Sequence, residues 1–315
     1  MTTTPTDDFV ARAESHRPAL RAHCYRMTAS LEDAEDLVQE TLLRAWRRQD
    51  SLHERSLLRP WLYRIATNVC LDALRRQPDR VAIGKGVEVP WLQPFPDEFL
   101  DQIAAGEEAP DATVAAKETI ELAFLVAIQH LPPRQRAVLL MRDVLGWSAA
   151  QAAETLEQSV PAVNSALQRA HATLREQLPQ RRSQWTAGEP SSEERELLER
   201  YMQAHHNADP DAIAALVGDE MRFTMPPQPT LIEGPQAFVR FMTESAFGAD
   251  SPGEFRLVPA RANRQPAAAN YIRAPGQDAF VAMSLDVLRI EGGRLVEVTT
   301  FEPHLFAAFG LPAQL

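Results

Sequence analysis

The chain has 315 residues, enough for two or three domains, and 45% of them are hydrophobic, which is sufficient for ordinary globular cores. No apolar run approaches the roughly 20 residues needed to cross a bilayer, and residues 1–8 lack the apolar core of a signal peptide. We therefore expect a cytoplasmic protein without membrane contact. The net charge of −11 excludes tight binding to free DNA by charge alone, because contacts with phosphates supply most non-specific affinity.

The negative charge is concentrated toward the C-terminus. Residues 1–188 contain 22 Lys and Arg against 25 Asp and Glu, whereas residues 189–315 contain 10 against 18. A subunit that a larger partner brings to DNA needs little affinity of its own. Both cysteines, Cys24 and Cys70, lie among apolar residues at helical spacing, which predicts buried thiols without a disulfide or a zinc site. We expect no metal and no cofactor.

The first strongly patterned segment is an acidic amphipathic helix, predicted over residues 31–46. Its apolar residues recur at i, i+3 and i+4 spacing and predict one buried face: Ala34, Leu37, Val38, Leu42, Ala45 and Trp46. Ser30 is expected to cap this helix, with Asp33 three residues further on. Acids near a helix N-terminus are also ordinary helix chemistry, so the acidic face by itself has two explanations.

An aromatic and basic helix is predicted next, over residues 59–76. The side chains that carry this pattern are Trp61, Tyr63, Arg64, Thr67, Asn68, Arg75 and Arg76. Aromatic rings interleaved with Arg suit unpaired DNA, because rings stack on bases and cations follow the backbone. The alternative is that the aromatic residues belong to the core, which we expect for at least one of Trp61 and Tyr63.

Residues 79–112 interrupt the helical pattern with prolines, glycines and acids, which predicts an extended linker with little core of its own. One stretch within it, Trp91-Leu92-Gln93-Pro94-Phe95-Pro96, is too aromatic for a purely solvated tether. It either packs on a domain or partner, or is a chance cluster. Residues 180–191 are expected to form a second linker.

The pattern between the two linkers predicts a helix-turn-helix. Periodicity resumes over residues 113–130, Pro132-Pro133 opens another helix, and Gly146 ends it. Ser148 is expected to cap a short helix over 149–156, and a turn leads into a longer helix over 160–178. The predicted outer face offers Ser159, Asn164, Ser165, Gln168, Arg169 and His171. Such side chains fit the major groove of DNA, although a solvated face on an ordinary bundle is the alternative.

Together these segments resemble a known family. Residues 33–41 (DAEDLVQET) followed by residues 59–68 (RPWLYRIATN) resemble region 2 of bacterial sigma factors of the extracytoplasmic-function group. Residues 131–176 are similar to region 4 of the same factors. The resemblance covers roughly residues 8–178, in the right order and spacing.

The resemblance implies two all-α modules, region 2 over residues 8–78 and region 4 over residues 113–179. It implies core RNA polymerase, through its β′ clamp and β flap, and promoter DNA as partners. The acidic helix would dock on the β′ clamp through Asp33, Asp36, Gln39 and Glu40. The helix over 59–76 would melt and read the −10 element, with Asn68 near a flipped-base pocket. The helix over 160–178 would read the −35 element, and the acidic linker would lie near the RNA exit path.

Residues 192–315 follow a different, α+β pattern. Helices are predicted over 193–206, 212–217 and 236–247, and strands over 254–258, 268–272, 280–290 and 294–301. Glu291-Gly292-Gly293 predicts a hairpin turn, because Gly tolerates the positive φ that such turns require. Together with Phe223-Thr224-Met225-Pro226-Pro227, these features resemble the SnoaL-like group. That resemblance implies a cone-shaped α+β fold with a curved antiparallel sheet around a pocket.

The candidate pocket residues are Tyr201, Phe223, Met225, Phe241 and Asp286. Asp286 faces the cavity in one strand register and solvent in the other. Some SnoaL-like proteins are enzymes, and the possible bases are Asp286, His205, His206, His304 and Glu302. No acid–base pair emerges from their positions, so we expect a regulatory or ligand-sensing domain. The alternative is a vestigial pocket lined by plain core residues.

We therefore expect an alternative sigma factor, not an enzyme, that directs core polymerase to specific promoters and is modulated by its C-terminal domain. A small-molecule ligand or an anti-sigma protein is a further expected partner. The alternative is a DNA-binding regulator fused to a SnoaL-like enzyme or small-molecule receptor.

Overall fold

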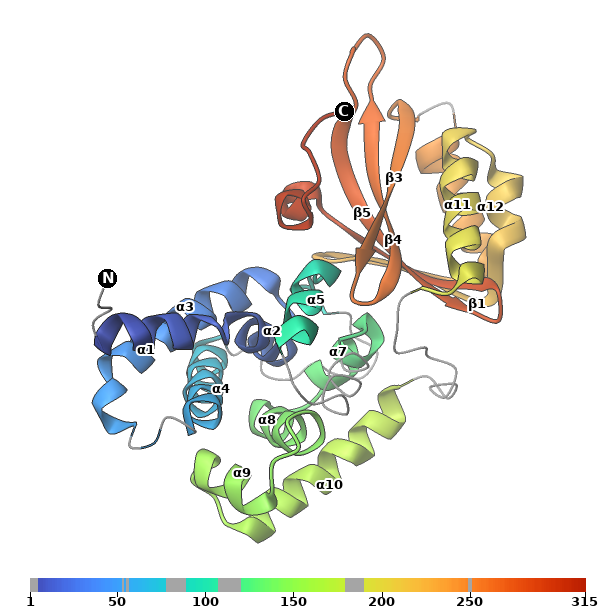
Figure 1. Cartoon of the computed structure of the whole chain (residues 1–315). Helices are drawn as coiled ribbons and strands as arrows, with labels where there is room; N and C mark the ends of the chain where they lie inside the picture. The colour runs from blue at the N-terminus through green and yellow to red at the C-terminus, as the bar shows by residue number, and fades with distance from the viewer. Residues whose placement is uncertain are drawn as a thin grey trace. The chain divides into compact units, whose positions relative to one another are not determined.

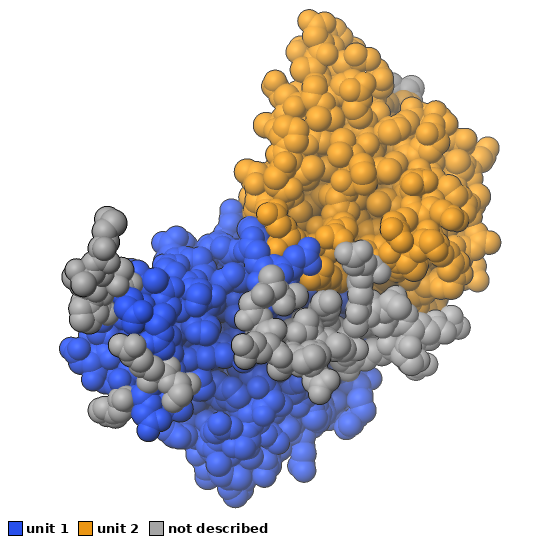
Figure 2. All heavy atoms as spheres, viewed as in Figure 1, with its two compact units in different colours: residues 1–87, 99–182 blue, residues 88–98, 183–315 orange. Residues whose placement is uncertain are grey.

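The computed structural model describes residues 5–52, 54, 57–77, 89–106, 120–178, 190–248 and 251–315. The chain forms two compact units (Figure 1, Figure 2). The first comprises residues 1–87 and 99–182, and the second comprises residues 88–98 and 183–315. No helix among the described residues is long and apolar enough to cross a membrane.

The N-terminal part of the first unit is a helical bundle. Its elements are α1 (Pro5–Glu14), α2 (Arg17–Thr28), α3 (Leu31–Arg47), the 3-10 turn η1 (Gln49–Ser51) and α4 (Leu58–Arg76). The core contains both free thiols, Cys24 and Cys70, as predicted. The Ser30 side chain accepts a hydrogen bond from the Asp33 N–H at 3.2 Å, which confirms the predicted cap of α3.

The C-terminal part of the first unit contains the predicted helix-turn-helix. Its elements are α7 (Leu122–Gln129), α8 (Pro133–Leu139), the π-helical turn η4 (Leu140–Val144), α9 (Ala149–Leu156) and α10 (Val160–Gln177). Ser148 and Gln151 form a capping box at the start of α9, and the Ser159 side chain caps α10. Because these caps satisfy the free N–H groups of each helix, the boundaries follow the sequence closely. The predicted helical residues 113–119 lie outside the described residues.

The second unit combines three α-helices with one mixed sheet. Helices α11 (Ser192–His206), α12 (Pro210–Leu216) and α13 (Pro235–Met242), followed by the π-helical turn η6 (Thr243–Phe247), share an apolar core with the sheet. The strands are β1 (Val217–Met225), β2 (Gln228–Glu233), β3 (Glu254–Ala262), β4 (Gln265–Arg273), β5 (Val281–Glu291) and β6 (Arg294–Phe301), in the order β2-β1-β6-β5-β4-β3. Helices α11 and α12 lie on one face of this sheet (Figure 1). A 3-10 helix, η7 (Pro303–Phe309), follows β6.

The sheet differs from the expected one in two respects. Strands β1 and β2 were not predicted. In β1, Gly218, Asp219 and Glu220 disfavour a strand and interrupt the apolar alternation. Strand β1 also pairs with β6 in parallel, with Phe223 beside Val298, so the sheet is not wholly antiparallel. The other neighbouring pairs are antiparallel, and Gly292 and Gly293 have positive φ in the predicted hairpin turn.

Residues 89–98 belong to the second unit, although they come from the linker between the helical modules. Val89, Leu92 and Phe95 are buried. The Phe95 N–H donates to Asn263 Oδ1 at 2.8 Å, and the Asn263 N–H donates to the Phe95 carbonyl at 2.9 Å.

The chain then forms helix α5 (Asp97–Gly106). Asp97 Oδ1 accepts a hydrogen bond from the Arg264 N–H at 2.8 Å. The alternative that residues 91–96 pack on a domain is therefore confirmed, whereas the prediction of an extended linker is wrong for the helical residues of α5. No local period encodes which surface the apolar residues of 91–96 pack on, so only the tertiary structure reveals their partner. Residues 79–88, 107–112 and 180–189 of the two linkers lie outside the described residues.

Candidate functional site

Helix α3 turns its predicted partner-binding residues away from its buried face. Asp36 and Gln39 are exposed, whereas Asp33 and Glu40 are half-buried. Glu40 Oε1 accepts a hydrogen bond from Arg44 Nε at 2.6 Å, and this pair shares one side of the helix at i, i+4 spacing. Asp36 and Gln39 are therefore the most accessible of the four.

An apolar groove runs beside these residues between α1 and α3. It is lined by Phe9, Val10, Ala13, Glu14, Arg17, Gln39, Leu42, Leu43 and Trp46. Leu43 and Trp46 are 49% and 48% exposed. The predicted burial of Trp46 is therefore wrong, because helical spacing does not distinguish an apolar face turned to the core from one turned to a partner. Contiguous exposed apolar surface is typical of interaction sites.

Helix α4 divides the predicted DNA-binding residues into accessible and buried sets. Arg64, Arg75 and Arg76 are exposed, and Trp61 and Asn68 are half-buried. Tyr63 and Thr67 are buried. One of the two aromatic residues is thus a core residue in this structure, as expected.

The buried set is organised around His23 of α2. The Tyr63 ring packs edge-on against the His23 ring, with centroids 5.2 Å apart. His23 Nε2 lies 2.9 Å from Thr67 Oγ1, which donates its own proton to the Tyr63 carbonyl at 2.8 Å. Complete burial, and secondarily Arg26, lowers the pKa of His23 to about 3, so the imidazole is neutral near pH 7 and donates through Nε2.

Within the first unit, helices α2 and α4 contact the part of the chain that contains the helix-turn-helix. Arg64 Nη1 lies 3.4 Å from Glu154 Oε1 on α9, and Tyr63 packs edge-on against Trp147, with centroids 6.5 Å apart. The fully buried Arg136 of α8 donates to the Met27 carbonyl at the end of α2. It also donates to carbonyl groups of the α7–α8 connection, those of Ile128, Gln129 and Leu131.

Helix α10 presents the predicted −35 residues on its open face. Ser159, Asn164, Ser165, Gln168 and Arg169 are exposed. His171 is half-buried, and its Nε2 lies 2.7 Å from Asp143 Oδ2. The buried face of α10 is formed by Val163, Ala166, Ala170 and Leu174.

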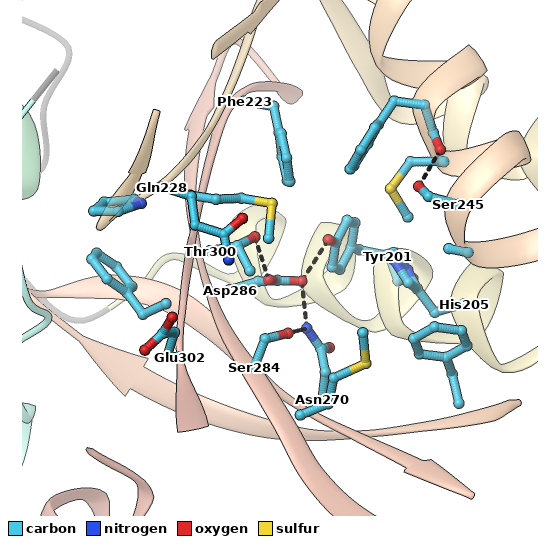
Figure 3. A pocket seen from close by; sticks show the side chains of 18 residues that line it. Tyr201, His205, Phe223, Gln228, Ser245, Asn270, Ser284, Asp286, Thr300 and Glu302 are labelled. Atoms are coloured by element: carbon cyan, nitrogen blue, oxygen red, sulfur yellow. Dashed lines mark hydrogen bonds between the residues drawn. The ribbon is translucent and has the colours of Figure 1, made fainter. Parts of the chain in front are cut away.

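The second unit contains a cavity of ≈ 320 Å³ that is partly open to solvent, shown in Figure 3. All five predicted pocket residues line it, and so do His205 and Glu302. His206 and His304 do not line it. Asn270, Ser284 and Thr300, which sequence reasoning missed, supply further polar groups from three different strands. No local pattern marks them, because their proximity depends on strand pairing.

Asp286 lies at the centre of a hydrogen-bond network (Figure 3). Its Oδ2 accepts from Tyr201 Oη and from Asn270 Nδ2, both at 2.8 Å, and its Oδ1 accepts from Thr300 Oγ1 at 2.7 Å. Burial, and then the neighbouring carboxylate, raise the pKa of Tyr201 well above its usual value, so the phenol stays protonated. The carboxylate faces the cavity, which is the first of the two registers considered.

Three families match successive parts of the chain. Residues 13–79 match Sigma-70 region 2, residues 121–174 match Sigma-70 region 4, and residues 198–298 match the SnoaL-like domain. The fold and these matches define a protein of the sigma-70 type with an additional α+β domain.

Similarity to individual proteins identifies the group of sigma factors to which the chain belongs. The chain is 43% identical to the ECF RNA polymerase sigma factor SigG of Mycobacterium tuberculosis, over 98% of this chain and 85% of that protein. It is 28% identical to SigJ of the same species, over 74% of this chain and 72% of that protein. The crystal structure of SigJ has the same overall fold, with a TM-score of 0.64 at 21% identity, over 96% of this chain and 99% of that one. The chain belongs to the ECF (extracytoplasmic-function) RNA polymerase sigma factors.

Proposed function

We propose that this protein directs core RNA polymerase to specific promoters through its first unit, and that its second unit modulates that activity without catalysing a reaction. Membership of the ECF sigma factors is the observation that carries the first part. The packing of residues 89–98 on the second unit carries the second part, because these residues connect the two helical modules in the chain.

The polymerase-binding surface is proposed to be the open side of α3. Asp36 and Gln39 are exposed there, and the exposed Leu43 and Trp46 extend the same side with apolar area. An interface commonly combines an apolar centre with charged groups at its edge. Asp33, Asp36, Gln39 and Glu40 would meet cations on the β′ clamp, with Leu43 and Trp46 supplying the apolar contact. The β flap would be a second polymerase contact.

Reading of the −10 element is assigned to α4. Arg64, Arg75, Arg76, Asn68 and Trp61 are accessible in part or in full and would bind the separated strands. Tyr63 and Thr67 would become available only after α4 separates from its neighbours. Such a step would also break the Arg64–Glu154 pair.

Reading of the −35 element is assigned to the open face of α10. Asn164, Ser165, Gln168 and Arg169 can pair with base edges, since their amide, hydroxyl and guanidinium groups match the major-groove pattern. Ser159 at the helix start would meet a phosphate, and His171 would do so beside Asp143.

The pocket of the second unit is proposed to hold a small molecule that regulates the sigma activity. Tyr201, Phe223, Met225, Phe241 and Asp286 would contact it. The three hydrogen bonds that the Asp286 oxygens already accept support binding over catalysis, because they leave at most one lone pair, on Oδ1, that could take a proton from a substrate.

Run-off transcription with core polymerase tests the proposal. Core enzyme plus the full chain should give a promoter-specific product that neither gives alone. Deletion of residues 190–315 should change the amount of that product at least twofold. Absence of any specific product would overturn the sigma function, and an unchanged product after the deletion would overturn modulation.

A further inference from the structure

We propose that the cavity of the second unit selects an uncharged ring molecule that carries a hydroxyl group, and that this hydroxyl donates a hydrogen bond to His205 Nε2. The proposal rests on the regulatory role proposed above and assigns the chemical class of the ligand.

The walls of the cavity select an apolar body. Phe223 and Phe241 lie with ring centroids 5.0 Å apart, and Met225, Phe255, Met283 and Phe301 also line the space. Flat rings and thioethers pack well against aromatic or alicyclic molecules. A volume of ≈ 320 Å³ lies in the range of small organic ligand sites.

The donors around Asp286 are already used inside the protein. Tyr201 and Thr300 donate to Asp286, and Asn270 Nδ2 donates to both Asp286 and Ser284 Oγ at 2.8 Å. Because a carboxylate can only accept, the nitrogen of the Asn270 amide must face Asp286. Its oxygen then has no hydrogen-bond partner among the described residues.

Besides the Asn270 amide oxygen, the imidazole of His205 offers a hydrogen-bond acceptor, and His205 lines the cavity. Its Nδ1 lies 2.9 Å from the Tyr201 carbonyl, so Nδ1 carries the proton in the neutral ring. Burial lowers the pKa of His205, which favours this neutral form with a lone pair on Nε2. Nε2 has no hydrogen-bond partner within the described part of the chain.

These groups favour a hydroxyl over other polar groups. A hydroxyl can donate a hydrogen bond to His205 Nε2 and brings no charge into the apolar cavity. A carboxylate would be repelled by the buried Asp286, since the described lining residues include no Lys or Arg. An ammonium would lose its hydration on entering, and the three protein donors leave Asp286 at most one acceptor site, on Oδ1.

Matched probe pairs test this selection on the full chain. Isothermal titration should give a Kd for 2-naphthol at least tenfold lower than for 2-methoxynaphthalene, and likewise for 4-phenylphenol against 4-methoxybiphenyl. The charged analogues 2-naphthoate and 2-naphthylmethylammonium should bind at least tenfold more weakly than 2-naphthol. Equal affinities within the pairs, no binding of either hydroxyl probe, or tighter binding of a charged analogue would overturn the proposal.

Variants locate the interaction. His205→Phe keeps a ring against Phe247 and Phe255 and should remove the advantage of 2-naphthol while leaving 2-methoxynaphthalene unchanged. The same change at the neighbouring His206, which does not line the cavity, should leave the advantage intact. Ala246→Trp should fill the space and weaken all probes at least tenfold. Unchanged affinities in Ala246→Trp or a retained advantage in His205→Phe would contradict the assigned site.

Run-off transcription distinguishes failure of the proposed ligand class from failure of the proposed regulatory role. If 2-naphthol binds as expected but leaves the run-off product unchanged, the ligand class stands and regulation through the pocket fails. If no hydroxyl probe binds but deletion of the second unit alters the product, the ligand class fails and modulation stands.

Discussion

Single buried polar side chains hold the helices of the first unit in place. His23 contacts Tyr63 and Thr67 of α4, and Arg136 joins α8 to the end of α2. Both groups are completely buried. A buried polar group stabilises a fold only while its partners are present and its charge state is unchanged. We therefore expect protonation of His23 and removal of Arg136 each to lower the stability of the first unit.

Protonation of His23 should make stability depend on pH. Its pKa of about 3 in the folded chain lies below the ordinary 6.5, so the unfolded chain binds a proton first as the pH falls. The contribution is fully present above pH 6.5 and is lost from there down to pH 3, by about 1.4 kcal/mol per pH unit. Between pH 7.5 and pH 5.0, urea unfolding should show a loss about 2 kcal/mol larger than that of His23→Gln. His304→Gln, which keeps His23, should retain the wild-type loss; equal losses in all three proteins would contradict this assignment.

Removing Arg136 should destabilise the first unit strongly. Arg136→Leu leaves the carbonyl groups of Met27, Gln129 and Leu131 without the donor that Arg136 supplies. We expect the free energy of unfolding to fall by about 3 kcal/mol or more, measured by urea titration of the helical circular dichroism signal. Arg134→Leu changes an exposed arginine on the same helix and should cost less than about 0.5 kcal/mol. A similar loss in both variants would argue against the role of Arg136.

At the scale of elements, helix α3 has one face that packs in the bundle and one face that is open to a partner. Its buried residues pack in the bundle, while Asp36, Gln39, Leu43 and Trp46 remain accessible to a partner. The capped N-terminus and the apolar spacing determine the helix locally. Which apolar residues stay exposed depends on the neighbouring α1, so the groove beside Trp46 could not be read from the pattern of α3 alone.

Charge reversal on this surface should weaken polymerase binding. Asp36→Arg places a cation where the proposed interface requires an anion, so the affinity for core polymerase should fall about tenfold or more. Asp50→Arg makes the same change at another exposed position of the first unit and should leave the affinity within twofold. Fluorescence anisotropy with labelled protein gives both values, and equal effects of the two variants would refute the assigned surface.

At the scale of the whole molecule, a linker segment is part of the C-terminal domain. Asn263 and Arg264 occupy the turn between β3 and β4 with φ of 57° and 59°. Such a turn directs its backbone and the Asn263 amide toward Phe95 and Asp97. Asn accepts positive φ more readily than most residues. Asn263 therefore fits the backbone of the turn, and its side chain also accepts the hydrogen bond from the Phe95 N–H.

Loss of the Asn263 side chain should loosen this segment. Asn263→Gly retains the positive φ but leaves the buried Phe95 N–H without its acceptor, and should lower the free energy of unfolding of the second unit by about 1–3 kcal/mol. Run-off transcription should change at least twofold in the same variant. Gln277→Gly, at the exposed turn between β4 and β5, should change neither quantity. Normal transcription with a destabilised Asn263→Gly protein would speak against modulation through residues 89–98.

Local chemistry by itself determined the helices of the two predicted helical modules, their caps and the hairpin turn, but not helix α5. Ser30, Ser148 and the Gly292-Gly293 turn act on neighbours a few residues away, so the sequence predicted the two helical modules and the later strands. Tertiary structure alone decided the parallel β1–β6 pair, the burial of Tyr63 and Thr67, and the packing of residues 89–98. It also brought Tyr201, Asn270 and Thr300 to Asp286. The physical reason is that these contacts join residues far apart in the chain, and no periodic pattern encodes which distant side chain satisfies a buried polar group.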